Sequence, residues 1–282
     1  MALQERLVTA SLCFTALLSL LFLFVVVAYI IVEGIGILSL EFLLEAPYRF
    51  EQGGIFPQII GSLCMVLICL LVAVPIGVAS AIYLAEYAPD NLITRSVRFF
   101  TECLAGIPSI VKGLFGLVFL VYYLRLGISM LAGGLTLGFM ILPWTVRASE
   151  EAIKAVPQSY REASLALGAT KLQTIRIVVL KSAYPGIITG ILLGMGKAIG
   201  ETAVVLLTAG SGLESFLPRS IRDPVGSLPV YIYMLATQGH TSAALSRAFG
   251  ASLVLIALFL AISVVALVLR NRYLRQMGGG RR

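Results

Sequence analysis

Long runs without a single charged residue constrain this chain more than any other feature. Residues 12–32, 52–85 and 248–269 contain no Asp, Glu, Lys or Arg. Each run is long enough to cross a bilayer, because a transmembrane helix needs about 20 predominantly apolar residues. Only 12% of the 282 residues are charged, whereas soluble domains carry about 25%. The sequence therefore predicts a membrane protein that crosses the bilayer several times.

We expect six transmembrane helices, which makes the chain an all-α membrane protein. The predicted spans are residues 12–32, 59–85, 99–124, 126–146, 182–208 and 248–269. The first run exceeds the apolar core of a secretory signal, about 7–15 residues, so we expect it to be retained. We divide the chain into a first helix with an extracytoplasmic lead-in (1–58), a transmembrane core containing a polar segment at 148–181 (59–272) and a basic tail (273–282).

The distribution of basic residues predicts which side of the membrane each connection faces. Cytoplasmic loops of membrane proteins are enriched in Lys and Arg. With both termini inside, fourteen of the 21 basic residues are cytoplasmic and five are outside, while Lys112 and Lys197 lie within spans. We therefore predict cytoplasmic termini and a cytoplasmic segment 148–181. The net charge of +7 follows from this bias, so we expect contact with lipid and not with nucleic acid.

The segment 148–181 has the pattern of a short helix, a glycine turn and a second helix. Pro157 suits the first turn of a helix, and Gly168 suits the position just after a helix end. Thr170 and Gln173 have the spacing of a capping box, so we expect the second helix to begin there and lead into the fifth span. The exposed apolar residues of the first helix fit a groove on another protein or an ordinary loop, and the pattern leaves both open.

The fifth predicted span carries charges on a face made of glycines. Its glycines repeat every four residues, the spacing of a helix-packing face: Gly186, Gly190 and Gly194. We expect one helix to continue to residue 208, so its repeat puts Lys197, Glu201 and Thr208 on that face, and the two charges are close enough to pair. Charges within a bilayer usually mark the route of a solute, although an ion pair that only fixes packing is the alternative.

Lys112 adds a third charge, beside a helix break that we expect at residues 106–109. It either joins the solute route or extends to the membrane surface. With Lys197 and Glu201 it leaves one net positive charge, which suits an anionic solute. The sequence shows no metal-ligand spacing and no hydrolase triad, and the residues around Lys197 lack the pattern of a nucleotide-binding loop. We expect no cofactor, no metal and no enzymatic site.

The polar segment also resembles a known family. Glu162-Ala163-Ser164 followed by Gly168 is similar to the EAA motif of ABC importer permeases, where it forms a coupling helix that sits in a groove of the ATPase. The residues that this resemblance assigns to ATPase coupling are Arg161, Glu162, Ala163, Ser164 and Gly168. The chain departs from the motif at Ser164, where the family has alanine, and at Lys181, where it has proline.

Four further stretches resemble the permease subunits of phosphate ABC importers, over about residues 57–270. They are residues 104–116, 197–203, 207–209 and 228–233. The resemblance implies the type I (MetI-like) importer permease fold, a prokaryotic inner membrane, a second related permease subunit in a heterodimer, two cytoplasmic ATPase subunits and an extracytoplasmic phosphate-binding protein. The expected solute pathway contains Lys197, Glu201, Thr202, Thr208, Lys112 and Arg147.

Two of these assignments have specific alternatives. The family usually has arginine where Lys197 stands, and lysine lacks the planar fork that binds phosphate at two points. Arg147 matches a family arginine but is equally suited to a cytoplasmic anchor. The hypothesis is alternating access, in which the ATPases push residues 160–168 and one continuous helical rod rocks the charged face. A molybdate or sulfate permease, an ion-coupled secondary transporter and a non-transporting scaffold are the other candidates.

Overall fold

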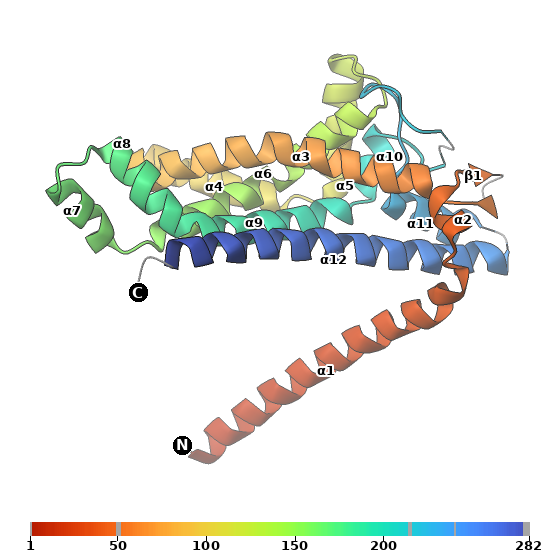
Figure 1. Cartoon of the computed structure of the whole chain (residues 1–282), viewed down its shortest axis with the longest axis horizontal. Helices are drawn as coiled ribbons and strands as arrows, with labels where there is room; N and C mark the ends of the chain where they lie inside the picture. The colour runs from red at the N-terminus through yellow and green to blue at the C-terminus, as the bar shows by residue number, and fades with distance from the viewer. Residues whose placement is uncertain (1, 49–51, 214–215, 240, 279–282) are drawn as a thin grey trace.

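The computed structural model describes residues 2–48, 52–213, 216–239 and 241–278 (Figure 1). Most of them are helical, and long helices run alongside one another through most of the molecule. The strands within the described residues are β1 (Pro47–Tyr48) and β2 (Gln52–Gly53), which pair antiparallel in a short hairpin. The predicted all-α class is confirmed.

Within the described residues, five helical stretches are long and apolar enough to cross a membrane. They contain α1 (Ala2–Gly34), α3 (Phe56–Ile82), α6 (Met130–Lys154), α9 (Leu180–Ile199) and α12 (Ser242–Gly278). A π-helical stretch, η2 (Tyr83–Tyr87), extends α3 toward the connection to α4. Because α12 continues to Gly278, most of the predicted basic tail is helical, and residues 279–282 lie outside the described residues.

The predicted third span is sharply bent. Helix α4 (Leu92–Gly106) meets α5 (Ser109–Gly116) and its π-helical extension η3 (Leu117–Tyr123) at an angle of 99°. Pro108 has no backbone N–H and disfavours the helical conformation of Ile107, which is extended here. The expected break is therefore present. The part of the chain that the structure describes has six candidate spans when this bent pair is counted as one.

The predicted fifth span ends earlier than expected. The chain leaves the helical path at Gly200, after Ile199, and a separate helix, α10 (Ala203–Thr208), follows. Our assignment of Glu201 and Thr208 to the face of Lys197 was wrong, because it assumed one uninterrupted helix. At the other end, α8 (Lys171–Gln173) and the π-helical η4 (Thr174–Val179) run into α9, so residues 171–199 form one continuous rod.

The glycines of α9 form a packing face, as predicted, and the structure shows that this face contacts α6. A Cβ atom on Gly186 would lie 2.7 Å from the Cβ of Ala152, and one on Gly190 would overlap Ala148. The two helix backbones are therefore too close for any side chain at these positions. Helix α3 covers the other side of α6, so α3, α6 and α9 form the centre of the bundle.

Helix α1 projects away from this bundle (Figure 1). Its membrane-spanning stretch is 0% buried within the chain, and its end packs on α12 through the rings of Tyr29 and Phe249, 5.4 Å apart. The 3-10 turn η1 (Ile35–Ile37), α2 (Leu40–Leu44) and α11 (Leu228–Gln238) lie at one end of the bundle. Helix α7 (Gln158–Ala166) lies at the opposite end, toward which the start of α1 and the end of α12 also point.

Candidate functional site

Lys197 stands in the last turn of α9 and contacts the only tryptophan of the chain. Its Nζ lies 4.7 Å from the centre of the Trp144 ring on α6, a cation–π distance. Lys197 is exposed and Trp144 is 46% exposed, so both form part of an open face of the bundle. The expected ion pair with Glu201 is not formed among the described residues.

Glu201 lies in the break between α9 and α10. Its Oε1 accepts a long hydrogen bond, 3.5 Å, from the backbone N–H of Val204 in the first turn of α10. A carboxylate is favourable at a helix N-terminus, which accounts for this position. Thr202 is half-buried beside it, whereas Thr208 is fully buried and donates its hydroxyl to the carbonyl of Val204 at 2.6 Å. Thr208 thus faces protein in this conformation.

Lys112 lies directly after the bend of the third span and is 5% exposed. Its Nζ donates to the carbonyl of Ala105 at 3.4 Å, at the end of α4. Helix α5 packs closely on α10, because a Cβ on Gly113 would lie 3.1 Å from the Cα of Val204. This contact brings Lys112 within electrostatic range of Lys197 and Glu201. Lys112 therefore lies in the same region of the bundle as Lys197 and Glu201, and it does not extend to an exposed surface.

Arg147 is paired with two carboxylates. Its guanidinium binds Glu151 one turn along α6 at 2.7 Å and also binds Glu102 of α4. The side chain of Arg147 is 50% exposed, but its charge is balanced in this conformation. Its role in a solute pathway stays a prediction.

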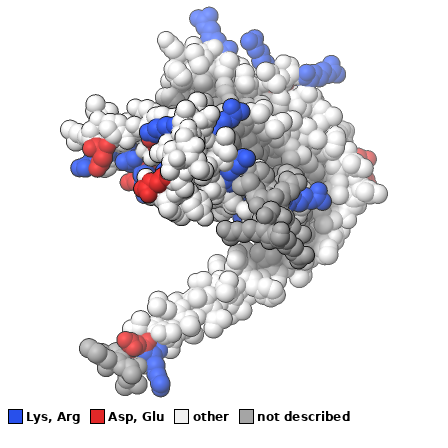
Figure 2. All heavy atoms as spheres, turned by 60° about the vertical axis from the view of Figure 1, so that its left-hand side comes forward, with Lys and Arg blue, Asp and Glu red and all other residues white. Residues whose placement is uncertain are grey.

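Helix α7 presents an open outer surface. Glu162 and Ala163 are exposed, and Leu167 is 90% exposed. Gly168 ends the helix with φ of +84°, a conformation that favours glycine. Thr170 and Gln173 form the predicted capping box. Figure 2 shows charged side chains gathered at this end of the molecule, whereas the shaft of α1 is uncharged.

The other two residues of the expected coupling set point inward. Arg161 binds Glu86 of η2 at 2.7 Å, and the hydroxyls of Ser164 and Thr174 are 2.9 Å apart. A cavity of about 690 Å³ lies behind the helix, lined by residues that include Glu86, Lys154, Arg161 and Lys171. The structure thus divides the predicted set into an outer group and an inner group.

Sequence reasoning missed three residues of these sites. Glu86 carries no local signal, because it lies 75 positions from Arg161. Trp144 is the lone tryptophan, three residues before Arg147, and that position was a usable signal. Glu150 is 4% exposed and binds both Arg98 and Lys154. Only its four-residue spacing from Lys154 was visible in the sequence.

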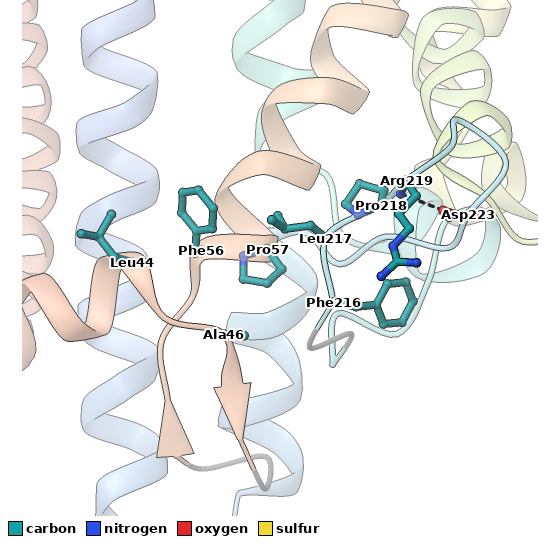
Figure 3. Close-up of a pocket in the computed structure, with 9 residues that line it drawn as sticks. All are labelled: Leu44, Ala46, Phe56, Pro57, Phe216, Leu217, Pro218, Arg219 and Asp223. Carbon is teal, nitrogen blue, oxygen red and sulfur yellow. Dashed lines mark hydrogen bonds between the residues drawn. The ribbon is translucent and has the colours of Figure 1, made fainter.

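A second cavity, about 810 Å³, lies at the end of the bundle opposite α7 (Figure 3). Apolar residues from three segments form most of its wall: Leu44, Ala46, Phe56, Pro57, Phe216, Leu217 and Pro218. Arg219 and Asp223 line one side, where the carboxylate of Asp223 accepts a hydrogen bond from the backbone N–H of Arg219 at 2.8 Å. This cavity is separate from the intramembrane charges.

Comparison with known proteins identifies close relatives. The family of binding-protein-dependent transport system inner membrane components matches residues 73–278. The phosphate transport system permease protein PstA of Xylella fastidiosa (strain Temecula1) is 34% identical over 277 residues, 95% of each chain. YqgI of Bacillus subtilis (strain 168), described as a probable ABC transporter permease protein, is 37% identical over 262 residues, 89% of this chain and 87% of YqgI.

Solved structures share the fold at lower identity. A chain of a bacterial ABC transporter that imports the acidic polysaccharide alginate has a TM-score of 0.60 at 16% identity, covering 91% of this chain and 95% of that chain. The inward-facing methionine ABC transporter MetNI gives a TM-score of 0.59 at 19% identity, covering 78% of this chain and 94% of that chain. The expected ABC importer permease fold is confirmed.

Proposed function

Because this chain belongs to the family of binding-protein-dependent transport system inner membrane components, we propose that it is the permease subunit of an ATP-driven phosphate importer. Relatives named phosphate transport system permease protein PstA, among them one 34% identical over 95% of this chain, support phosphate as the solute. The permease component of such a system is not itself catalytic, so ATP hydrolysis takes place in partner ATPase subunits.

The observation that carries the proposal is the continuous rod of residues 171–199. One end of the rod adjoins α7, whose exposed outer surface suits the groove of an ATPase. The other end carries Lys197, which lies within electrostatic range of Lys112, as does Glu201 in the break that follows the rod. Movement of α7 would therefore turn the charged site from one side of the membrane to the other. One net positive charge favours an anion, and transport needs no covalent chemistry.

The exposure of Lys197 supports a second permease subunit. An ammonium that faces lipid at the bilayer centre costs at least about 2.5–3.5 kcal/mol, so the open face beside Trp144 requires a protein or aqueous neighbour. A related subunit in a heterodimer would supply it and enclose the pathway. Each permease subunit would bind one of two ATPase subunits, and an extracytoplasmic phosphate-binding protein would deliver the solute.

We place the protein in a prokaryotic inner membrane with both termini in the cytoplasm. The start of α1, the end of α12 and α7 point to the same end of the molecule (Figure 1), in agreement with the bias of basic residues. We retain the division into a first helix with lead-in (1–58), a transport core (59–272) and a basic tail (273–282).

Charge-neutralising variants test the pathway in the reconstituted complex. Lys197→Gln and Glu201→Gln should each lower ATP-driven phosphate uptake by about tenfold, the effect of one lost charge-assisted contact. Lys181→Gln is the matched control, because Lys181 is exposed on the same rod near its cytoplasmic end. If Lys197→Gln takes up as much phosphate as the control, Lys197 is not part of the pathway. That result would not contradict the proposed function of phosphate import.

The alternatives differ in measurable ways. A permease for molybdate or sulfate would take up those anions in preference to phosphate. An ion-coupled secondary transporter would not hold an ATPase through α7, so the ATPase would fail to co-purify with it. Gly168→Asp should weaken that co-purification in an importer, because aspartate adds a charge and a strained backbone at the end of the contact helix.

A further inference from the structure

Arg161 lies on α7, and within the described part of the chain its guanidinium bonds to groups on the inner side of that helix. Its Nε and Nη2 donate to the same carboxylate oxygen of Glu86, at 3.0 and 2.7 Å. Its Nη1 donates to the carbonyl of Val156 at 2.6 Å, and Nη2 also donates to the carbonyl of Ile153 at 2.9 Å. The side chains of Arg161 and Glu86 are 14% and 8% exposed. This arginine is therefore not available to a partner protein.

These bonds join three separate elements. Glu86 lies in η2, which is the cytoplasmic continuation of α3. Ile153 lies in the last turn of α6, where helix carbonyls favour a cation, and Val156 lies two residues after the end of that helix. Only an arginine fork can reach one carboxylate and two carbonyls in different directions. Arg161 thus ties α7 to the ends of α3 and α6 at once.

A third connection leads from α7 into the rod. The hydroxyl of Ser164, one turn after Arg161, lies 2.9 Å from that of Thr174, which is buried at the start of η4. If the bond between Ser164 and Thr174 were the only connection, a movement of α7 would displace the rod but not α3 or α6. With Arg161 in place, α7 is fixed to α3 and α6 as well as to the rod.

We propose that Glu86 and Arg161 form a clasp that transmits displacement of α7 to α3 and α6, and that Glu86 is a positioning residue for coupling. The inference rests on the proposed function, because α7 moves only if an ATPase binds it. It assigns a coupling role to a residue outside the segment 148–181. The proposal also gives the residues of this region two different roles. Glu162 in α7 and Leu167 directly after it contact the partner, whereas Arg161 bonds α7 to its own chain.

The ratio of phosphate transported to ATP hydrolysed tests the coupling role of the Glu86–Arg161 pair directly. It is measured in the complete complex with its ATPases and binding protein. Glu86→Gln keeps the shape of the side chain but leaves Arg161 without a counter-charge. We expect an assembled complex that hydrolyses ATP but transports about tenfold less phosphate per ATP. Arg161→Lys should show an intermediate loss, because an ammonium keeps the charge and cannot span all three partners.

Asp90→Asn is the matched control. Asp90 lies in the same cytoplasmic connection, and its ion pair with Arg95 is local and exposed. Arg95 donates to Asp90 and thereby lowers the pKa of that carboxyl. Removal of this carboxylate breaks no link between elements, so the control should transport as much phosphate per ATP as the wild type.

Double substitution separates a coupling unit from two independent effects. If the clasp acts as one unit, Glu86→Gln combined with Arg161→Gln should be no worse than either single variant. The proposal would be overturned if Glu86→Gln transported as much phosphate per ATP as the wild type. It would also be overturned if the loss in the double variant equalled the product of the two single losses. Failure of Glu86→Gln alone to assemble would overturn it too, because the pair would then serve folding only. Absence of phosphate uptake by the wild type would instead refute the proposed function.

Discussion

Substitution of Glu150 by glutamine tests the energetics of the ion-pair cluster that Glu150 forms with Arg98 and Lys154. The carboxylate is 4% exposed and binds Arg98 of α4 at 2.7 Å and Lys154 at 2.6 Å. Glu150→Gln keeps the volume but leaves Arg98, itself 26% exposed, without a counter-charge. Removal of one partner of a buried pair costs about 3–5 kcal/mol. Because both cations keep some contact with solvent, we expect about 3 kcal/mol.

Thermal unfolding of the purified protein in detergent measures this loss. For a chain of this size, 1 kcal/mol corresponds to about 2–4 °C in Tm, so the midpoint should fall by about 6–12 °C. Asp90→Asn, in which an exposed pair is removed, should leave the midpoint where it is. If Glu150→Gln and Asp90→Asn unfold at the same temperature, the cluster contributes no more than a surface pair, and the reasoning is refuted.

Three further predictions address the packing, the intramembrane charge and the turn after α7. Gly190→Ala should lower Tm and Gly106→Ala should not, because overpacking against Ala148 costs about 1–3 kcal/mol while Gly106 faces open space; equal midpoints would contradict the close approach of α6 and α9. Iodide should quench Trp144 several-fold less in Lys197→Gln than in Lys181→Gln, since the ammonium over the ring attracts anions; unchanged quenching would show that Lys197 lies elsewhere. Gly168→Val should weaken ATPase binding more than Gly168→Asn, because asparagine adopts positive φ at lower cost than a β-branched residue, and the reverse order in a co-purification assay would exclude the strained turn.

Local sequence patterns predicted much of this structure. The uncharged runs identified three of the spans, the four-residue glycine repeat identified a packing face on α9, and the capping box identified the start of the rod. Each of these features depends on residues within a few turns of one another. Helical periodicity and capping chemistry are therefore sufficient to find them.

The features that the sequence did not reveal depend on distant residues or on ambiguous breaks. A glycine such as Gly200 is tolerated inside a helix as well as at its end, so the interruption before Glu201 could not be recognised from the sequence. The predicted ion pair between Lys197 and Glu201 assumed an uninterrupted helix, and it is therefore not formed in the part of the chain that the structure describes. The contacts of Lys197 with Trp144 and of Arg161 with Glu86 join different helices. Charge alone indicated that these residues need partners, and only the packing of the helices supplies them.

Uptake of radiolabelled phosphate into proteoliposomes tests the central claim most directly. The vesicles contain this chain with the permease and ATPase subunits that we propose as its partners, and the proposed binding protein is supplied outside. We predict phosphate accumulation that requires internal ATP and is not reduced by excess sulfate or molybdate. Accumulation driven by an ion gradient without ATP, or suppressed by either competing oxyanion, would contradict the assignment of this protein to ATP-driven phosphate import.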